Sequence, residues 1–213
     1  SEMCIRDRYD GDTEDNLFHG QGSLTWPDGR YYEGEFQQGL MTGEGRLEGR
    51  DGCVQEGHFV NGVLNGEGSY TCPDASYQGQ FTNGELTKGS VAYLDDNSYQ
   101  GEFRDFQPHG QGLWVTASAE QFEGTFAEGY MVKGTYRNEE GYHYQGEFDF
   151  FTFEGKGELT RPDGVVIRAT FENGHAEGPG TRTRPRDEGE PVVEKGFFVP
   201  VSYTHLTLPT NGC

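Results

Sequence analysis

A phenylalanine recurs along the chain at a nearly constant interval, and this repeat restricts the fold more than any other feature. G-x-G or K-G pairs mark the repeat, and their second glycines are spaced 21 to 23 residues apart, from Gly22 to Gly180. Each unit then has an aromatic slot, a glycine slot two residues later and a phenylalanine two residues after that. The phenylalanine is present in every unit, as Phe36, Phe59, Phe81, Phe103, Phe126, Phe148 and Phe171. Such self-similarity predicts an array of small stacked units in place of one thick core.

Each unit is predicted to be a β-hairpin. In "YYEGEF", alternation places Tyr32, Gly34 and Phe36 on one face of a strand and Glu33 and Glu35 on the other. Turn signals such as "PDGR" and "DDNS" precede this strand. We expect the central glycine to leave bare backbone over which rings of the neighbouring unit can lie. We expect the G-x-G pair to mark the passage from one hairpin to the next.

These motifs resemble the MORN repeat (membrane occupation and recognition nexus), whose pattern is roughly Y-x-G-x-[FW]-x-x-G-x-x-x-G-x-G. The resemblance covers about residues 18–181, and it departs where Gln55 replaces an aromatic residue and Ala169 replaces a central glycine. It implies an all-β fold, in which hairpins of about 23 residues stack into an elongated, single antiparallel sheet with a repeat or solenoid-like architecture.

The chain is predicted to divide into four segments. Residues 10–181 form an array of about seven repeats. Residues 182–200 form a degenerate capping repeat, because Gly196 and Phe198 keep part of the motif. Residues 1–9 and 201–213 match neither the repeat nor its composition and resemble translated sequencing-adapter sequence, so we predict that they are non-native flanks.

The charge of the chain favours some partners over others. The 213 residues have a net charge of −20, which opposes binding to nucleic acid and to anionic lipid. We therefore predict no nucleic-acid partner, and membrane lipid is disfavoured. A basic protein partner is compatible with this charge.

The four cysteines, Cys4, Cys53, Cys72 and Cys213, form no C-x-x-C pair. Cys53 and Cys72 lie at different phases of successive repeats, so we expect free thiols in a reducing compartment. We accordingly predict a cytoplasmic protein, and the family resemblance adds an association with the cytoskeleton or a membrane.

No pattern in the sequence indicates catalysis, a cofactor or a metal. The stretch "GEGRLEG" (43–49) is explained by the repeat and lacks the spacing of a phosphate-binding loop. Glu33 and Glu35 share the polar face of a strand, where solvation is expected in place of acid–base chemistry. No histidine spacing resembles a zinc site. We predict a protein that is not an enzyme and that holds neither cofactor nor metal.

The aromatic face of the array is predicted to hold the partner site. A single-layer sheet has little core, so part of this face is expected to remain open as a binding groove. The ladder residues expected to pack between repeats are Tyr32, Phe36, Phe59, Tyr77, Phe81, Tyr99, Phe103, Phe122, Phe126 and Phe171. The candidates for contact with a partner are Tyr130, Met131, Tyr144, Phe148, Phe150, Phe151 and Phe153.

We therefore expect a scaffold that docks a partner peptide or helix, basic in character, or a second copy of the chain. The resemblance implies roles in cytoskeletal, ciliary or membrane-contact assemblies. It leaves two alternatives open. One is an accessory region of a larger enzyme, such as a SET-type lysine methyltransferase or a phosphatidylinositol phosphate kinase. The other is a phospholipid-binding module.

Overall fold

Two compact units make up the computed structural model, the first ending at Gln107 and the second beginning at Pro108, and residues 7–199 and 205–207 are described. The first unit contains β1 (Arg8–Glu14), β2 (Leu17–Thr25), β3 (Tyr31–Gln37), β4 (Leu40–Glu48), β5 (Val54–Val60), β6 (Val63–Thr71), β7 (Ala75–Thr82), β8 (Glu85–Tyr93) and β9 (Ser98–Arg104). The second contains β10 (Gln107–Val115), whose first residue closes the first unit, β11 (Gln121–Ala127), β12 (Tyr130–Arg137), β13 (His143–Asp149), β14 (Thr152–Thr160), β15 (Val166–Glu172), β16 (His175–Arg184), β17 (Val192–Val199) and β18 (His205–Thr207).

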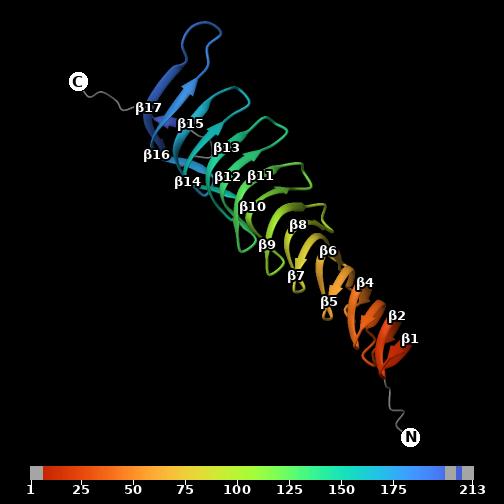
Figure 1. Cartoon of the computed structure of the whole chain (residues 1–213). Helices are drawn as coiled ribbons and strands as arrows, with labels where there is room; N and C mark the ends of the chain where they lie inside the picture. Colours follow the sequence, from red (N-terminus) through yellow and green to blue (C-terminus); the bar gives the residue numbers. More distant parts are fainter. Residues whose placement is uncertain (1–6, 200–204, 208–213) are drawn as a thin grey trace, which may run out of the picture. The chain divides into compact units, whose positions relative to one another are not determined.

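Each unit is an antiparallel run in which every strand pairs with the next one along the chain (Figure 1). The described residues contain no helix, and accordingly none that is long and apolar enough to span a membrane. The prediction of an all-β fold built from antiparallel hairpins is confirmed in both units.

Wide and tight connections alternate along each unit. The predicted "PDGR" turn is a wide one, in which the Gly29 N–H donates to the Trp26 carbonyl at 3.0 Å. Asp28 fixes this loop, because its carboxylate accepts hydrogen bonds from the backbone N–H and the Nε of Arg30. The Arg30 guanidinium in turn lies 4.8 Å from the centre of the Trp26 ring.

Two-residue turns make the tight connections. Both residues of each turn have a positive φ, as type I′ hairpin turns require. These turns are Asp15–Asn16, Gln38–Gly39, Asn61–Gly62, Asn83–Gly84, Asp105–Phe106, Glu128–Gly129, Phe150–Phe151 and Asn173–Gly174. Asparagine followed by glycine is the pair that this geometry favours most, and phenylalanine in the second position is the exception.

Successive tight turns are joined by backbone hydrogen bonds. The N–H of Gly39 donates to the carbonyl of Phe18 at 2.9 Å, and that of Gly62 donates to Met41 at 2.9 Å. The N–H of Gly174 makes the same bond to Phe153 at 3.0 Å. Each of these three turns therefore docks beside the tight turn of the preceding repeat.

The G-x-G pair lies inside a strand, so the prediction that it marks the passage between hairpins is wrong. Gly43 and Gly45 both belong to β4, and the turn Gln38–Gly39 makes the passage. Gly43 has a φ of +55° at a bulge, where β4 has extra residues relative to β3. Sequence reasoning confused a bulge with a turn because both favour glycine.

A row of paired glycines crosses the strands of each unit. From β2 to β9 the row is Gly22, Gly34, Gly45, Gly57, Gly68, Gly79, Gly89 and Gly101. The ring of Tyr32 lies over this row, since a Cβ added to Gly45 would come within 2.6 Å of Tyr32 Cε2. Gly45 belongs to a G-x-G pair, however, and the prediction concerned the central glycine of the motif. Over the central glycine Gly34 lies the ring of Tyr32 from the same strand, so the prediction that a ring of the neighbouring repeat lies there is wrong.

The ends of the array continue the repeat. In β1, Tyr9 stacks on Phe18 with ring centres 3.9 Å apart, as Tyr144 stacks on Phe153 further along. In β17, Gly196 pairs with Gly180, and the Phe198 side chain is buried. Most of the two predicted flanks, residues 1–6, 201–204 and 208–213, lies outside the described residues.

Candidate functional site

The predicted ladder forms the core of both units. Tyr32, Phe36, Phe59, Phe81, Tyr99, Phe103, Phe122, Phe126 and Phe171 are buried, and Tyr77 is half-buried. Edge-to-face contacts link the rings within one repeat and across to the next. The ring centre of Tyr32 lies 5.1 Å from that of Phe36 and 5.3 Å from that of Phe59. These side chains hold the repeats together, and little of their surface is available to a partner.

The seven predicted partner residues divide by exposure. Met131, Tyr144 and Phe148 are buried and belong to the core. Phe151 and Phe153 are half-buried, while Tyr130 and Phe150 are 44% and 63% exposed. Contacts connect most of the set, including Tyr130–Phe150 at 4.4 Å, Tyr130–Phe151 at 6.4 Å, Tyr144–Phe148 at 5.1 Å and Phe148–Phe153 at 5.7 Å between ring centres. Of these seven residues, a partner can therefore reach only Tyr130, Phe150, Phe151 and Phe153.

Phe151 occupies an unusual position, because it is the second residue of a tight turn where most repeats have glycine. Its φ is +64°, in the left-handed region that bulky side chains avoid. The ring reaches back over the preceding repeat and contacts Trp114 at 5.3 Å and Phe122 at 5.1 Å. Ring packing thus offsets the strain of the backbone.

Phe106 repeats this arrangement in the first unit. It has a φ of +58° and holds the same turn position. Its ring centre lies 5.4 Å from Tyr70, 5.4 Å from Tyr77 and 6.4 Å from Phe81. Tyr70 and Tyr77 correspond in the repeat to Trp114 and Phe122. The ring of a turn phenylalanine therefore fills an equivalent site in each unit.

A hollow of about 340 Å³ opens beside Phe151, on the side of the following repeat. Its lining residues are Glu120, Phe122, Tyr136, Phe151, Thr152, Phe153 and Gly174. Two predicted partner residues, Phe151 and Phe153, are among them. The volume lies at the lower end of the range for sites that bind small molecules, and it suits a single side chain of a larger partner.

The polar part of the hollow is organised around one carboxylate. The Tyr136 hydroxyl donates to Glu120 Oε1 at 2.6 Å, and the Ser118 hydroxyl donates to Glu120 Oε2 at 3.2 Å. Burial, followed by the hydrogen bond to Glu120, raises the pKa of Tyr136 well above its ordinary value. Glu140 adds a second negative charge near this hydroxyl. The hollow thus combines aromatic walls with an acidic rim.

Sequence reasoning missed Glu120, Tyr136, Thr152 and Gly174 as lining residues. Tyr136 of β12 lies opposite Phe122 of β11 and Tyr144 of β13, so strand register places it among the aromatic residues of this face. Nothing in the sequence around Gly174 marks this glycine as a lining residue. The comparison that reveals its role is the phenylalanine at the same place one repeat earlier.

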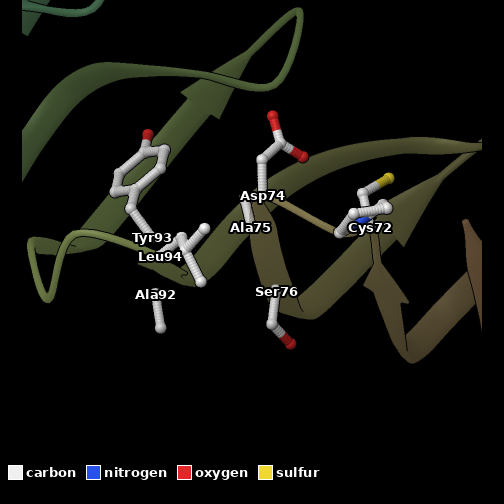
Figure 2. Close-up of a pocket in the computed structure, with 8 residues that line it drawn as sticks. Cys72, Asp74, Ala75, Ser76, Ala92, Tyr93 and Leu94 are labelled. Atoms are coloured by element: carbon white, nitrogen blue, oxygen red, sulfur yellow. The ribbon is translucent and has the colours of Figure 1, made fainter.

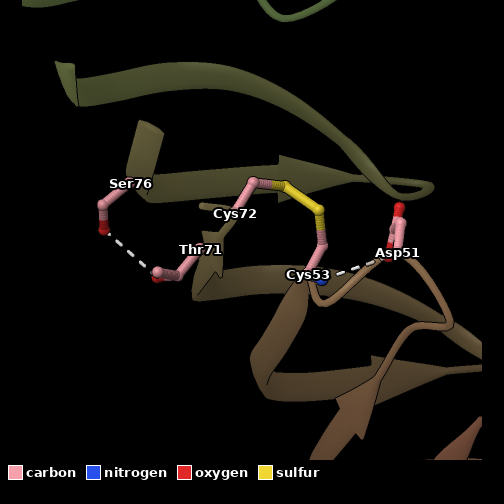
Figure 3. Close-up of a disulfide and its surroundings, with 5 residues drawn as sticks. All are labelled: Asp51, Cys53, Thr71, Cys72 and Ser76. Atoms are coloured by element: carbon pink, nitrogen blue, oxygen red, sulfur yellow. Dashed lines mark hydrogen bonds between the residues drawn. A yellow bond between two sulfur atoms is a disulfide. The ribbon is translucent and has the colours of Figure 1, made fainter. Parts of the chain in front are cut away.

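Cys53 and Cys72 form a disulfide, so the prediction that they are free thiols is wrong (Figure 3). Val54 of β5 pairs with Thr71 of β6, and the two cysteines are the next pair along the same antiparallel ladder. Their Cα atoms are 4.2 Å apart. Repeat phase was the wrong criterion, because antiparallel strands bring together residues at different phases.

A smaller hollow of about 180 Å³ adjoins this disulfide in the first unit. Figure 2 shows Tyr93 and Leu94 on one side and Cys72 and Asp74 on the other. The Leu94 N–H donates to the Asp74 carbonyl at 3.0 Å, which joins two successive wide loops. Burial raises the pKa of Tyr93 to about 12. Over residues 7–199 and 205–207, the side chains of His, Cys, Asp and Glu form no group of three or more able to hold a metal ion.

Comparison with known families decides the relationship of the chain. The family model described as "MORN repeat" matches residues 9–29, 32–54, 56–76, 77–86, 99–118, 144–166 and 169–186. The chain belongs to the MORN-repeat family. The whole of β11 and β12 falls between the matches at residues 99–118 and 144–166, and β12 carries Tyr130, Met131 and Tyr136.

Two solved structures are among those that the chain resembles. The first is the TCP10 domain of Danio rerio CPAP in complex with a peptide of Danio rerio STIL, with 11% identity, a TM-score of 0.44 and coverage of 90% of this chain and 83% of that one. The second is the SAS-4 (dCPAP) TCP domain of Drosophila melanogaster in complex with a proline-rich motif of Ana2 (dSTIL), with 9% identity, a TM-score of 0.35 and coverage of 91% and 92%. No curated protein matches the chain at a significant level.

Proposed function

We propose that this MORN-repeat chain is a non-enzymatic interaction module that docks a segment of a protein partner on the aromatic surface of its second unit. The observation that carries the proposal is the hollow beside Phe151, which is open to solvent although every ladder residue except half-buried Tyr77 is buried. Aromatic side chains in such hollows supply most of the affinity in protein interfaces.

The charge of the chain supports a basic partner. Glu120 lines the hollow, Glu140 adds negative charge near the Tyr136 hydroxyl, and the net charge of −20 extends this bias to the whole chain. Acidic surfaces select basic partners and raise the rate of association. A role in a cytoskeletal, ciliary or membrane-contact assembly is part of the proposal. The prediction of a cytoplasmic location rested on free thiols, and the Cys53–Cys72 disulfide removes that support, because disulfides are typical of oxidising environments.

Affinity capture with the full chain tests the proposal. Thr152→Trp fills the hollow from an exposed lining position. His175→Trp is the matched control, because His175 is the exposed first residue of β16, as Thr152 is of β14, and it does not line the hollow. Proteins captured from cells of the source organism should bind the wild type and His175→Trp and be lost with Thr152→Trp. Equal capture by both variants would place the interaction elsewhere, and capture of nothing above a blank resin would defeat the proposed function.

A further inference from the structure

The repeat shows what the hollow is shaped to hold. One repeat before the hollow, the ring of Phe151 contacts Trp114 and Tyr130, with ring centres at 5.3 and 6.4 Å. Shifted by one repeat, Trp114 corresponds to Tyr136, which faces Tyr144 across the strands as Trp114 faces Phe122. Tyr130 corresponds to Thr152, since each is the first residue of its strand.

The equivalent of Phe151 itself is Gly174, the second residue of the next tight turn. Gly174, Tyr136 and Thr152 all line the hollow. Two of the walls of the site that receives an aromatic ring one repeat earlier are thus present again, but glycine supplies no ring to fill it. The counterparts of the other two walls, Tyr144 and Phe148, are buried and do not line the hollow. Phe106 shows that this occupation recurs, because its ring packs on the corresponding residues Tyr70 and Tyr77 in the first unit.

The rim of the hollow limits what accompanies the ring. Glu120 lines the hollow, and its carboxylate accepts hydrogen bonds from the hydroxyls of Tyr136 and Ser118. A neutral ring would leave this charge without a counter-charge from the partner, whereas a Lys or Arg next to the ring would pair with it. Arg is the better match, because its guanidinium also stacks on aromatic faces.

We infer that the hollow binds the aromatic side chain of a partner segment in which Lys or Arg adjoins the aromatic residue, and that this ring takes the place that Phe151 occupies one repeat earlier. The inference rests on the proposed interaction function and names the chemistry of the partner. The rest of the segment lies along the acidic surface, where its basic residues are favoured by the charge of the chain.

Two variants at one position separate the ring from the backbone. Gly174 has a φ of +82°, so both Gly174→Ala and Gly174→Phe strain the turn, but only phenylalanine can fill the hollow from within. The melting temperature of Gly174→Phe should therefore be a few degrees higher than that of Gly174→Ala. A melting temperature at or below that of Gly174→Ala would refute the equivalence with Phe151, whatever the partner is.

Binding is tested with random peptides displayed on phage and selected on the full wild-type chain. We expect selected peptides to share an aromatic residue next to Lys or Arg. They should bind Gly174→Ala within about twofold of the wild type and bind Gly174→Phe at least about tenfold more weakly. Glu120→Gln, which keeps an acceptor for Tyr136, should weaken the same peptides and reduce their dependence on salt.

The outcomes distinguish this inference from the proposed function. Peptides that lack an aromatic residue, or that bind Gly174→Phe as well as the wild type, overturn the inference and leave a protein-interaction role intact. A selection that yields no binding peptide also overturns it. The capture experiment with Thr152→Trp judges the proposed function separately, because it does not depend on the sequence of the partner.

Discussion

Adjacent phenylalanines in one tight turn offer a direct test of how ring packing offsets backbone strain. Phe150 and Phe151 both have positive φ, at 45° and 64°. The Phe150 ring contacts Tyr130 and is 63% exposed, whereas the Phe151 ring is half-buried against Trp114, Phe122 and Phe126. Replacing either residue by glycine removes a similar backbone strain, but the Phe151 variant loses much more side-chain packing than the Phe150 variant.

The expected magnitudes follow from these contacts. A non-glycine residue in the left-handed region costs about 1–2 kcal/mol, of which glycine returns roughly 1 kcal/mol after its own loss of entropy on folding. Truncating a fully buried phenylalanine costs about 3–5 kcal/mol, so half-buried Phe151 accounts for about 2 kcal/mol. Its ring pairs add about 1–2 kcal/mol. Phe151→Gly should therefore destabilise the second unit by about 2–3 kcal/mol, and Phe150→Gly should leave its stability within about 1 kcal/mol.

Urea unfolding followed by tryptophan fluorescence measures both variants. The two tryptophans, Trp26 and Trp114, report on different units, and Trp114 contacts the Phe151 ring itself. In Phe151→Gly, the midpoint of the unfolding transition reported by Trp114 should move to a lower urea concentration. The midpoint of the transition reported by Trp26 should not change. Equal midpoints for Phe150→Gly and Phe151→Gly would show that the ring of Phe151 does not stabilise the turn.

Three further predictions concern the first unit. Gly45→Ala should lower the free energy of unfolding by about 1–3 kcal/mol, because the new Cβ would come within 2.6 Å of Tyr32 Cε2; a stability equal to that of the wild type in urea would contradict the close ring–glycine packing. Burial raises the pKa of Tyr32 from 10.0 to about 12, so its stabilising effect should be complete below pH 10 and be lost as the pH rises to 12; tyrosinate absorbance that titrates at its ordinary pKa in the folded chain would argue against this. Cys53→Ser should cost about 2–4 kcal/mol, because the Cys53–Cys72 disulfide closes a loop across β5 and β6; alkylation of both thiols without prior reduction would show that the bond is not formed.

The fold could be predicted from the sequence because every repeat carries the same alternation of buried and exposed residues. The alternation in "YYEGEF" fixed the faces of β3, and Tyr32 and Phe36 are buried as that alternation requires. Glycine was harder to interpret, since one residue type serves three roles. Gly39 closes a turn, Gly43 forms a bulge and Gly45 admits a ring, and only the backbone angles and contacts separate these roles.

The candidate site was predictable only in part. Phe151 and Phe153, two of the predicted partner residues, line the hollow, but burial removes Phe148 and Tyr144 from any partner. Exposure depends on how strands stack, and sequence spacing does not record it. The disulfide was missed for a related reason, because the pairing of Cys53 with Cys72 depends on strand register across two units of the repeat.

The hydrogen bonds between successive tight turns have a consequence for how such an array can change. Gly39, Gly62 and Gly174 each dock through a backbone N–H to a backbone carbonyl, and the glycine row brings strands together without side chains. This part of the junction is nearly independent of which side chains a repeat carries. A duplicated or exchanged unit therefore finds matching partners in any neighbour, so the length of the array can change by whole repeats while the exposed residues diversify.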